Sequence, residues 1–167
     1  MDLIVGADGW AQFGAERCRC AVGPAGFSFD KREGDGATPV GAWPCRMLYY
    51  RPDRLSAPRT GLPTIALKPE DGWCDAPGDP RYNRLVTLPY PASAETLWRD
   101  DHVYDLIVPL GYNDAPVVPG RGSAIFLHLA RLDFIATQGC IALAFIDLLA
   151  FLENADITSR VVITART

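Results

Sequence analysis

The residues best suited to chemistry in this 167-residue chain are a histidine and a cysteine that lie twelve positions apart. His128 ends an apolar run, and Cys140 closes the sequence Thr137-Gln138-Gly139-Cys140. Only the thiolate is a good nucleophile, and a free thiol with a pKa near 8.5 is ionised to about 3% at pH 7. A nearby imidazole can accept the thiol proton, and backbone N–H groups around Gly139 and Cys140 could stabilise an oxyanion. This pair could therefore carry out covalent acyl transfer.

Structural roles for the same two residues remain open at this point. A cysteine among apolar neighbours is commonly a small core residue, and a histidine at a strand end commonly makes a structural hydrogen bond. The second histidine, His102, follows the charged residues 99–101, which favours a solvated position. The five cysteines include Cys18 and Cys20, whose spacing is not the CxxC of zinc and redox sites, and their odd number favours reduced thiols. We therefore expect no metal and no cofactor.

Short strands are expected to position these residues. Apolar runs and alternation predict strands at residues 2–5, 18–22, 46–50, 103–108, 123–129 and 159–165. The run at 123–129 is almost entirely apolar, which predicts a strand buried on both faces. The fold class predicted for residues 1–167 is one mainly β domain.

A single helix is expected at residues 144–155, where apolar residues recur at helical spacing. Cys140 would then lie on a strand-to-helix turn, where the helix dipole favours a thiolate. Residues 51–91 are rich in proline and predict a long, mostly irregular stretch of the kind that is often functional.

Composition and charge exclude several classes of protein. Sixteen basic and twenty acidic residues give a net charge of −4, which argues against a dedicated nucleic-acid binder. Hydrophobic residues make up 49%, which excludes global disorder. The chain as given shows no secretory signal and no stretch long enough for a membrane span. We therefore expect a cytoplasmic protein, or a periplasmic one if the sequence is a trimmed piece of a longer chain.

Several segments together resemble the catalytic core of the YkuD-type L,D-transpeptidases. The central match joins residues 122–128 (GSAIFLH) to residues 137–143 (TQGCIAL). Residues 31–41 (KREGDGATPVG) are similar to the family's K…GDG-TP-G region, and shorter similarities occur at residues 72–75, 82–84, 104–105 and 111–113. The resemblance covers roughly residues 18–165.

This resemblance implies a β-sandwich-type catalytic domain with one or two short helices and a cysteine acyl-enzyme. The implied substrates are peptidoglycan stem tetrapeptides or muropeptides, cut between the L-centre of meso-diaminopimelate and the terminal D-alanine. By the resemblance, Cys140 is the nucleophile, His128 is the general base, and Gly139 with Cys140 contributes oxyanion donors. The resemblance also implies that a backbone carbonyl near Leu129 orients the imidazole.

Two positions depart from the family pattern. Gln138 stands where many members have histidine, and Ala142 stands where many have arginine, so one expected cation for a substrate carboxylate is missing. Arg84 or Arg121 could replace it, because a guanidinium group binds a carboxylate through two hydrogen bonds, although each could equally be a surface arginine. Trp73, Tyr82 and Tyr112 could line the cleft or could be core anchors.

Four functional hypotheses remain open. An amine that resolves the acyl-enzyme gives transpeptidation, whereas water gives L,D-carboxypeptidase activity, which the absence of a signal favours. Gln138 and Ala142 motivate a third hypothesis, a non-catalytic module that binds wall peptides. The fourth is an unrelated thiol hydrolase that acts on a small amide. The sequence makes no prediction of oligomeric state.

Overall fold

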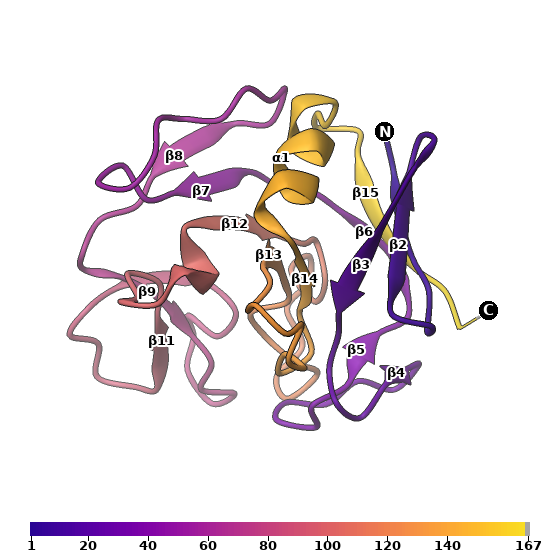
Figure 1. The fold of residues 1–167 in the computed structure, drawn as a ribbon. Coiled ribbons are helices and arrows are strands. Elements are labelled where there is room, and N and C mark those ends of the chain that lie inside the picture. The colour runs from indigo at the N-terminus through magenta and orange to yellow at the C-terminus, as the bar shows by residue number, and fades with distance from the viewer. Residues whose placement is uncertain (166–167) are drawn as a thin grey trace.

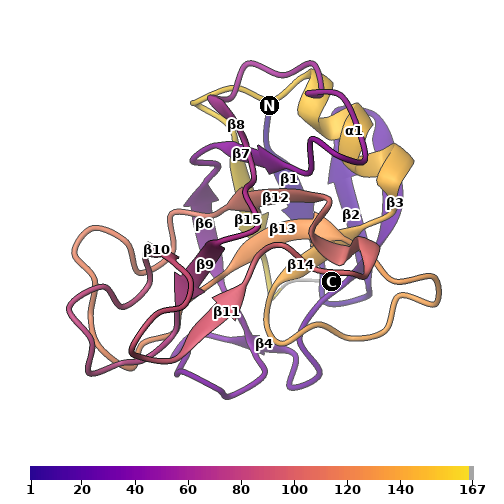
Figure 2. The same ribbon diagram turned by 90° about the vertical axis from the view of Figure 1, so that its left-hand side faces the viewer.

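The computed structural model of the chain describes residues 1–165, and a curled ten-stranded sheet is its main feature (Figures 1 and 2). The strand order is β6-β15-β1-β2-β3-β14-β13-β12-β7-β8. These strands are β1 (Leu3–Val5), β2 (Trp10–Phe13), β3 (Glu16–Ala21), β6 (Gly41–Pro44), β7 (Leu48–Tyr50), β8 (Thr64–Ala66), β12 (Leu106–Pro109), β13 (Phe126–Leu129), β14 (Ile141–Leu143) and β15 (Arg160–Ile163).

Smaller elements complete the fold. A three-stranded sheet has the order β10-β9-β11, and β4 pairs with β5. The bounds are β4 (Phe27–Ser28), β5 (Thr38–Pro39), β9 (Asp71–Cys74), β10 (Leu85–Thr87) and β11 (Ala94–Thr96). The α-helix α1 (Phe145–Glu153) packs against the large sheet, and a short 3₁₀ turn, η1 (His102–Tyr104), precedes β12 (Figure 1).

Strand β13 is buried on both faces and separates two hydrophobic clusters. Leu127 and Leu129 point into the main core, which also takes the α1 side chains Leu148, Phe151 and Leu152. Phe126 points the other way, into a smaller cluster that includes Cys140. Because side chains alternate along a strand, His128 shares the face of Phe126. The parallel partner β14 places Ala142 directly opposite His128.

The mainly β fold class predicted from the sequence is confirmed, and so is the burial of the strand around 123–129 on both faces. The helix is found within its predicted range. Residues 51–91 are mostly irregular, as predicted, although they also contain the short strands β8, β9 and β10. These strands have only three or four residues each, too few for alternation to be recognised between the prolines.

The prediction that Cys140 lies on a strand-to-helix turn is wrong. Strand β14 intervenes, and α1 begins five residues after the cysteine, at Phe145. The helix dipole decays within the first turn and therefore does not act on the thiol. The apolar residues of β14 continue directly into those of α1, so no boundary between the two elements is visible in the sequence. Among residues 1–165, no helix is long and apolar enough to cross a membrane.

Candidate active site

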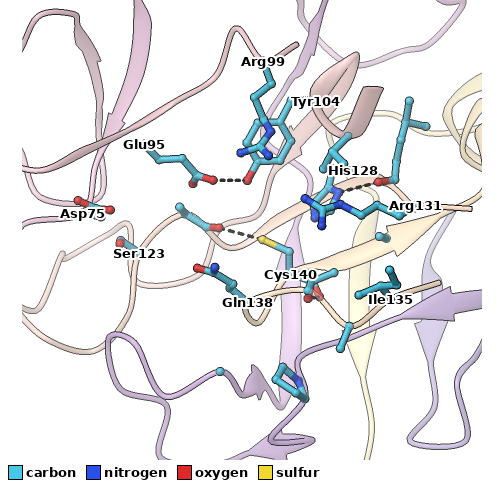
Figure 3. Close-up of a pocket in the computed structure, with 18 of the residues that line it drawn as sticks. Asp75, Glu95, Arg99, Tyr104, Ser123, His128, Arg131, Ile135, Gln138 and Cys140 are labelled. Atoms are coloured by element: carbon cyan, nitrogen blue, oxygen red, sulfur yellow. Dashed lines mark hydrogen bonds between the residues drawn. The ribbon is translucent and has the colours of Figure 1, made fainter. Parts of the chain in front are cut away.

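Cys140 and His128 line the same cavity, which has a volume of about 500 Å³ (Figure 3). His128 extends from β13, and Cys140 immediately precedes the neighbouring strand β14. Both side chains are buried, with 5% and 7% of their residue surfaces exposed. The pair of adjacent strands therefore brings together the two residues that the sequence singled out.

The Cys140 thiol is held by backbone groups. It donates a hydrogen bond to the Ala124 carbonyl at 3.1 Å and accepts one from the Phe126 N–H at 3.4 Å. Burial raises the pKa of this thiol to about 12, and the nearby Glu95 carboxylate adds to the effect. The thiol is therefore protonated at neutral pH and needs a base to become nucleophilic.

One ring nitrogen of His128 is held by a backbone carbonyl. Its Nδ1 lies 3.0 Å from the Leu129 carbonyl, which can only accept, so Nδ1 carries the hydrogen and Nε2 is left to take a proton. The family resemblance had implied an orienting carbonyl at this position. The Tyr104 ring packs edge-on against the imidazole, with ring centroids 5.3 Å apart. Burial lowers the pKa of His128 to about 4, which keeps the imidazole neutral.

The turn before Cys140 depends on a glycine. Gly139 has φ +117°, and a Cβ atom there would lie 2.6 Å from the Ala37 carbonyl oxygen. The Gly139 N–H donates to Thr137 Oγ1 at 3.2 Å, and the Thr137 hydroxyl donates to the Cys140 carbonyl at 2.7 Å. An oxyanion role for the Gly139 N–H therefore requires that the substrate oxygen replaces the threonine oxygen.

Residues 31–41, the K…GDG-TP-G region, pack against this turn through the backbone of Ala37. The Asp35 carboxylate accepts hydrogen bonds from the Ala37 N–H at 2.9 Å and the Arg32 N–H at 2.7 Å. It also pairs with the ammonium of Lys31, which is almost fully buried. A buried lysine is costly without such a partner, so the pair fixes the loop whose Ala37 backbone contacts Gly139.

A buried asparagine connects three segments behind the thiol. Asn83 Oδ1 accepts from Trp73 Nε1 at 2.9 Å and from the Ala124 N–H at 3.0 Å. Its Nδ2 donates to the carbonyls of Tyr112 at 3.1 Å and Asn113 at 2.8 Å, which completes its hydrogen-bonding capacity. Ala124 has φ +52°, a conformation that few non-glycine residues adopt. Asn83 thus fixes the backbone whose carbonyl holds the Cys140 thiol.

The two arginines expected to bind a substrate carboxylate lie elsewhere. Arg84 donates to the Asp114 carbonyl at 2.6 Å, and Arg121 pairs with Asp30 at 3.4 Å. Neither belongs to the described residues that line the cavity. A substrate contact by either arginine stays a prediction that the geometry of this cavity does not favour.

The aromatic residues predicted for the cleft have packing roles. Trp73 packs edge-to-face on Phe126 with ring centroids 5.2 Å apart, and Tyr112 packs similarly on Trp43 at 4.9 Å. Neither Trp73 nor Tyr112 is among the described residues that line the cavity. Both nevertheless reach the site indirectly, because Asn83 bonds to the Trp73 indole and the Tyr112 carbonyl.

Two arginines that line the cavity, Arg99 and Arg131, were not predicted as site residues from the sequence. Both lie close enough to the His128 imidazole to help lower its pKa. The small Ala142 lines the cavity opposite His128 and leaves space there. Residues 99–102 looked solvated because they are charged. Asp100 and His102 are indeed exposed, whereas only 31% of the Arg99 side chain is exposed.

The other four cysteines do not share this environment. Cys18, Cys20, Cys45 and Cys74 are free and buried, and none is among the described residues that line the cavity. Burial raises the pKa of Cys18 to about 11 and of Cys20 and Cys45 to about 12. No cluster of three or more potential metal ligands occurs within residues 1–165.

Comparison with protein families shows which family the chain belongs to. The family model for the L,D-transpeptidase catalytic domain, YkuD, matches residues 7–163. The chain belongs to this L,D-transpeptidase family. Searches of curated proteins and of solved structures gave no significant match.

Membership in the L,D-transpeptidase family agrees with the mainly β architecture and with a function related to peptidoglycan. The matched range contains His128, Cys140 and the supporting loop at residues 31–41. Strand β1 lies outside that range, although it occupies an interior position between β15 and β2.

Proposed function

We propose that the chain is a cysteine acyltransferase that acts on peptidoglycan stem tetrapeptides and releases their terminal D-alanine. The observation that supports this proposal is the shared cavity, into which the Cys140 thiol and the His128 imidazole both open beside the Gly139 turn. Family membership supports the substrate class. In the proposal, Cys140 is the nucleophile, His128 is the base and the Leu129 carbonyl orients the imidazole. Peptidoglycan peptides are therefore the proposed partners.

Both groups are neutral at rest, so the first step is a proton transfer. As the sulfur attacks the scissile carbonyl, the S–H proton moves to His128 Nε2, and the Ala124 carbonyl loses its hydrogen bond from the thiol. The carbonyl oxygen becomes an oxyanion, which backbone N–H groups near Gly139 would stabilise. The imidazolium formed in this step is held by the Leu129 carbonyl.

The second step releases the leaving group. The C–N bond breaks as the tetrahedral intermediate collapses, and the imidazolium gives its proton to the departing amine of D-alanine. A thioester on Cys140 and a neutral His128 remain. An acceptor amine then attacks the thioester, gives its proton to His128 and receives the acyl group, while the thiolate recovers that proton. Water could take the place of the amine, which would give a tripeptide.

The proposal is tested by incubating the protein with a disaccharide-tetrapeptide, with and without an added D-amino acid, and analysing the products by mass spectrometry. We expect D-alanine release and an exchanged tetrapeptide that carries the added D-amino acid, both lost in Cys140→Ala. Tripeptide alone under both conditions would replace transfer with hydrolysis. No product from the native protein would contradict acyl chemistry and favour a wall-peptide-binding module.

A further inference from the structure

The candidate cavity is lined by side chains of both charges, arranged around the thiol. Figure 3 shows Glu95 and Asp75 on one side of Cys140, with His128 and Arg131 on the other. This separation is unexpected for a site that binds only a neutral peptide bond, because carboxylates and guanidinium groups facing a cavity attract opposite charges on a ligand.

The positive side of the cavity consists of Arg99 and Arg131, and these two arginines pair with only one carboxylate, that of Asp101. Arg99 forms a two-pronged pair with Asp101, with Nε–Oδ1 at 2.8 Å and Nη2–Oδ2 at 2.7 Å. Arg131 Nη2 lies 3.4 Å from the same Asp101 Oδ2. Two guanidinium groups therefore share one carboxylate. Within residues 1–165, Arg99 Nη1 has no hydrogen-bond partner, so the pair keeps donors and net positive charge for a ligand carboxylate.

On the negative side, neither Glu95 nor Asp75 forms an ion pair within residues 1–165, although the charge of Arg99 acts on Glu95 from farther away. Asp75 Oδ1 is fully buried and has no hydrogen-bond partner among the described residues. Glu95 accepts one hydrogen bond, from the Tyr104 hydroxyl at 2.6 Å. Burial raises the pKa of Glu95. The Tyr104 hydrogen bond and the charge of Arg99 oppose this rise, and the charge of Asp75 adds to it. An unpartnered buried carboxylate oxygen is costly, and a ligand with N–H donors and positive charge would remove that cost.

A third carboxylate in the cavity differs from these two. Glu33 Oε2 accepts a hydrogen bond from Ser123 Oγ at 2.7 Å and another from the Tyr82 hydroxyl, so its position is already fixed by the protein. The described residues contain no cluster that matches a metal site. The open positions on Glu95 and Asp75 therefore fit a hydrogen-bonding organic cation, such as a primary ammonium.

We propose that this cavity selects a donor peptide by two charges, a terminal carboxylate at Arg99 and Arg131 and a free ammonium at Glu95 and Asp75. The inference rests on the proposed function and adds residues that determine its specificity. It also orients the peptide. His128 must reach the leaving amine, so the leaving amino acid, with its carboxylate, lies on the arginine side. The acyl part then extends past Cys140 toward the two acids.

The experiment measures binding to Cys140→Ala by calorimetry, so that turnover does not interfere. Three peptides are compared: a tetrapeptide whose third residue carries a free side-chain amine, the same peptide acetylated on that amine, and the same peptide with a C-terminal amide. Acetylation and amidation are each expected to weaken binding by about 10- to 100-fold, as for the loss of a charged hydrogen bond.

Second substitutions assign each loss to its side of the cavity. Adding Glu95→Gln should reduce the effect of acetylation to less than about 3-fold and leave the effect of amidation unchanged. Adding Arg131→Gln should reduce the effect of amidation in the same way. Glu153→Gln on α1 and Arg17→Gln on β3 are matched controls outside the cavity, and they should change neither effect.

The outcomes separate this inference from the proposed function. Equal affinity for the three peptides, the same acetylation effect with and without Glu95→Gln, or no binding of any peptide would overturn the inference. Release of D-alanine by the native protein alongside such a result would leave the proposed function intact. Charge-dependent binding without any D-alanine release would support the inference and contradict acyl transfer.

Discussion

At the scale of residues, the candidate site holds a neutral thiol and a neutral imidazole. Burial raises the pKa of Cys140 to about 12 and lowers the pKa of His128 to about 4, so each group is held in its uncharged form. The thiol donates to the Ala124 carbonyl, and the imidazole donates to the Leu129 carbonyl. Attack would therefore depend on a base that acts during the reaction, without a preformed thiolate–imidazolium pair.

This state predicts how the reactivity of Cys140 varies with pH. The thiolate fraction of a group with a pKa of about 12 rises about tenfold per pH unit up to that value, so the alkylation rate by iodoacetamide should increase steadily from pH 6 to pH 9. Peptide-resolved mass spectrometry measures the rate at Cys140, with the urea-unfolded protein as the control that levels off near pH 9. A rate at Cys140 that is constant across this range would indicate an ion pair instead.

At the scale of elements, two adjacent strands and two supporting segments build the site. Strands β13 and β14 set the distance between His128 and Cys140, and their parallel register puts Ala142 opposite the histidine. The loop at residues 31–41 presses its Ala37 carbonyl against Gly139. Asn83 secures Ala124 from the other side. Changes in these supports should therefore alter chemistry without touching the substrate.

Gly139→Ala tests the contact between the turn and the supporting loop. Gly139 has φ +117°, and the new Cβ would lie 2.6 Å from the Ala37 oxygen. We therefore expect the free energy of unfolding to fall by about 2 kcal/mol or more and acylation to be largely lost. Gly78→Ala is the matched control, because a Cβ there would have open space. Urea unfolding measures both variants. Equal stability of the two would refute the steric role of Gly139.

Asn83→Ala tests the support behind Ala124. It removes four hydrogen bonds from a buried position, and we expect the free energy of unfolding to fall by about 2–4 kcal/mol. The exposed Asn154, whose amide bonds only to the Ala150 carbonyl, provides the control, and Asn154→Ala should lose less than about 1 kcal/mol. Chemical denaturation compares them, and similar losses would argue against Asn83 as a structural centre.

At the scale of the whole molecule, β1 joins β15 to β2 in the interior of the large sheet, although it lies outside the matched family range. Leu3 is fully buried, whereas its neighbour Ile4 is 41% exposed. Leu3→Ala should lower the free energy of unfolding by about 2–5 kcal/mol, and Ile4→Ala by less than about 1 kcal/mol. Thermal or urea unfolding tests this pair of variants. A loss for Leu3→Ala as small as that for Ile4→Ala would mean that β1 contributes little to the core.

Much of this molecule could be predicted from its sequence, and the failures have physical reasons. The apolar run ending at His128 indicated a strand buried on both faces, which the structure confirms. The helix dipole at Cys140 was a wrong prediction, because β14 and α1 form one continuous apolar sequence. Arg99 was missed because its charged segment suggested solvent, and Arg131 had no sequence feature that marked it. Only the fold of residues 94–104 and 130–138 brings both to the cavity.

The central claim is that Cys140 is the nucleophile and that the other four cysteines are not. The most direct measurement is peptide-mapped mass spectrometry after a brief exposure to a carbapenem, a class of compound that acylates active members of the family. We expect one adduct, located on Cys140, present when Cys18 is replaced by alanine and absent from Cys140→Ala. An adduct on another cysteine, or none on the native protein, would contradict the account.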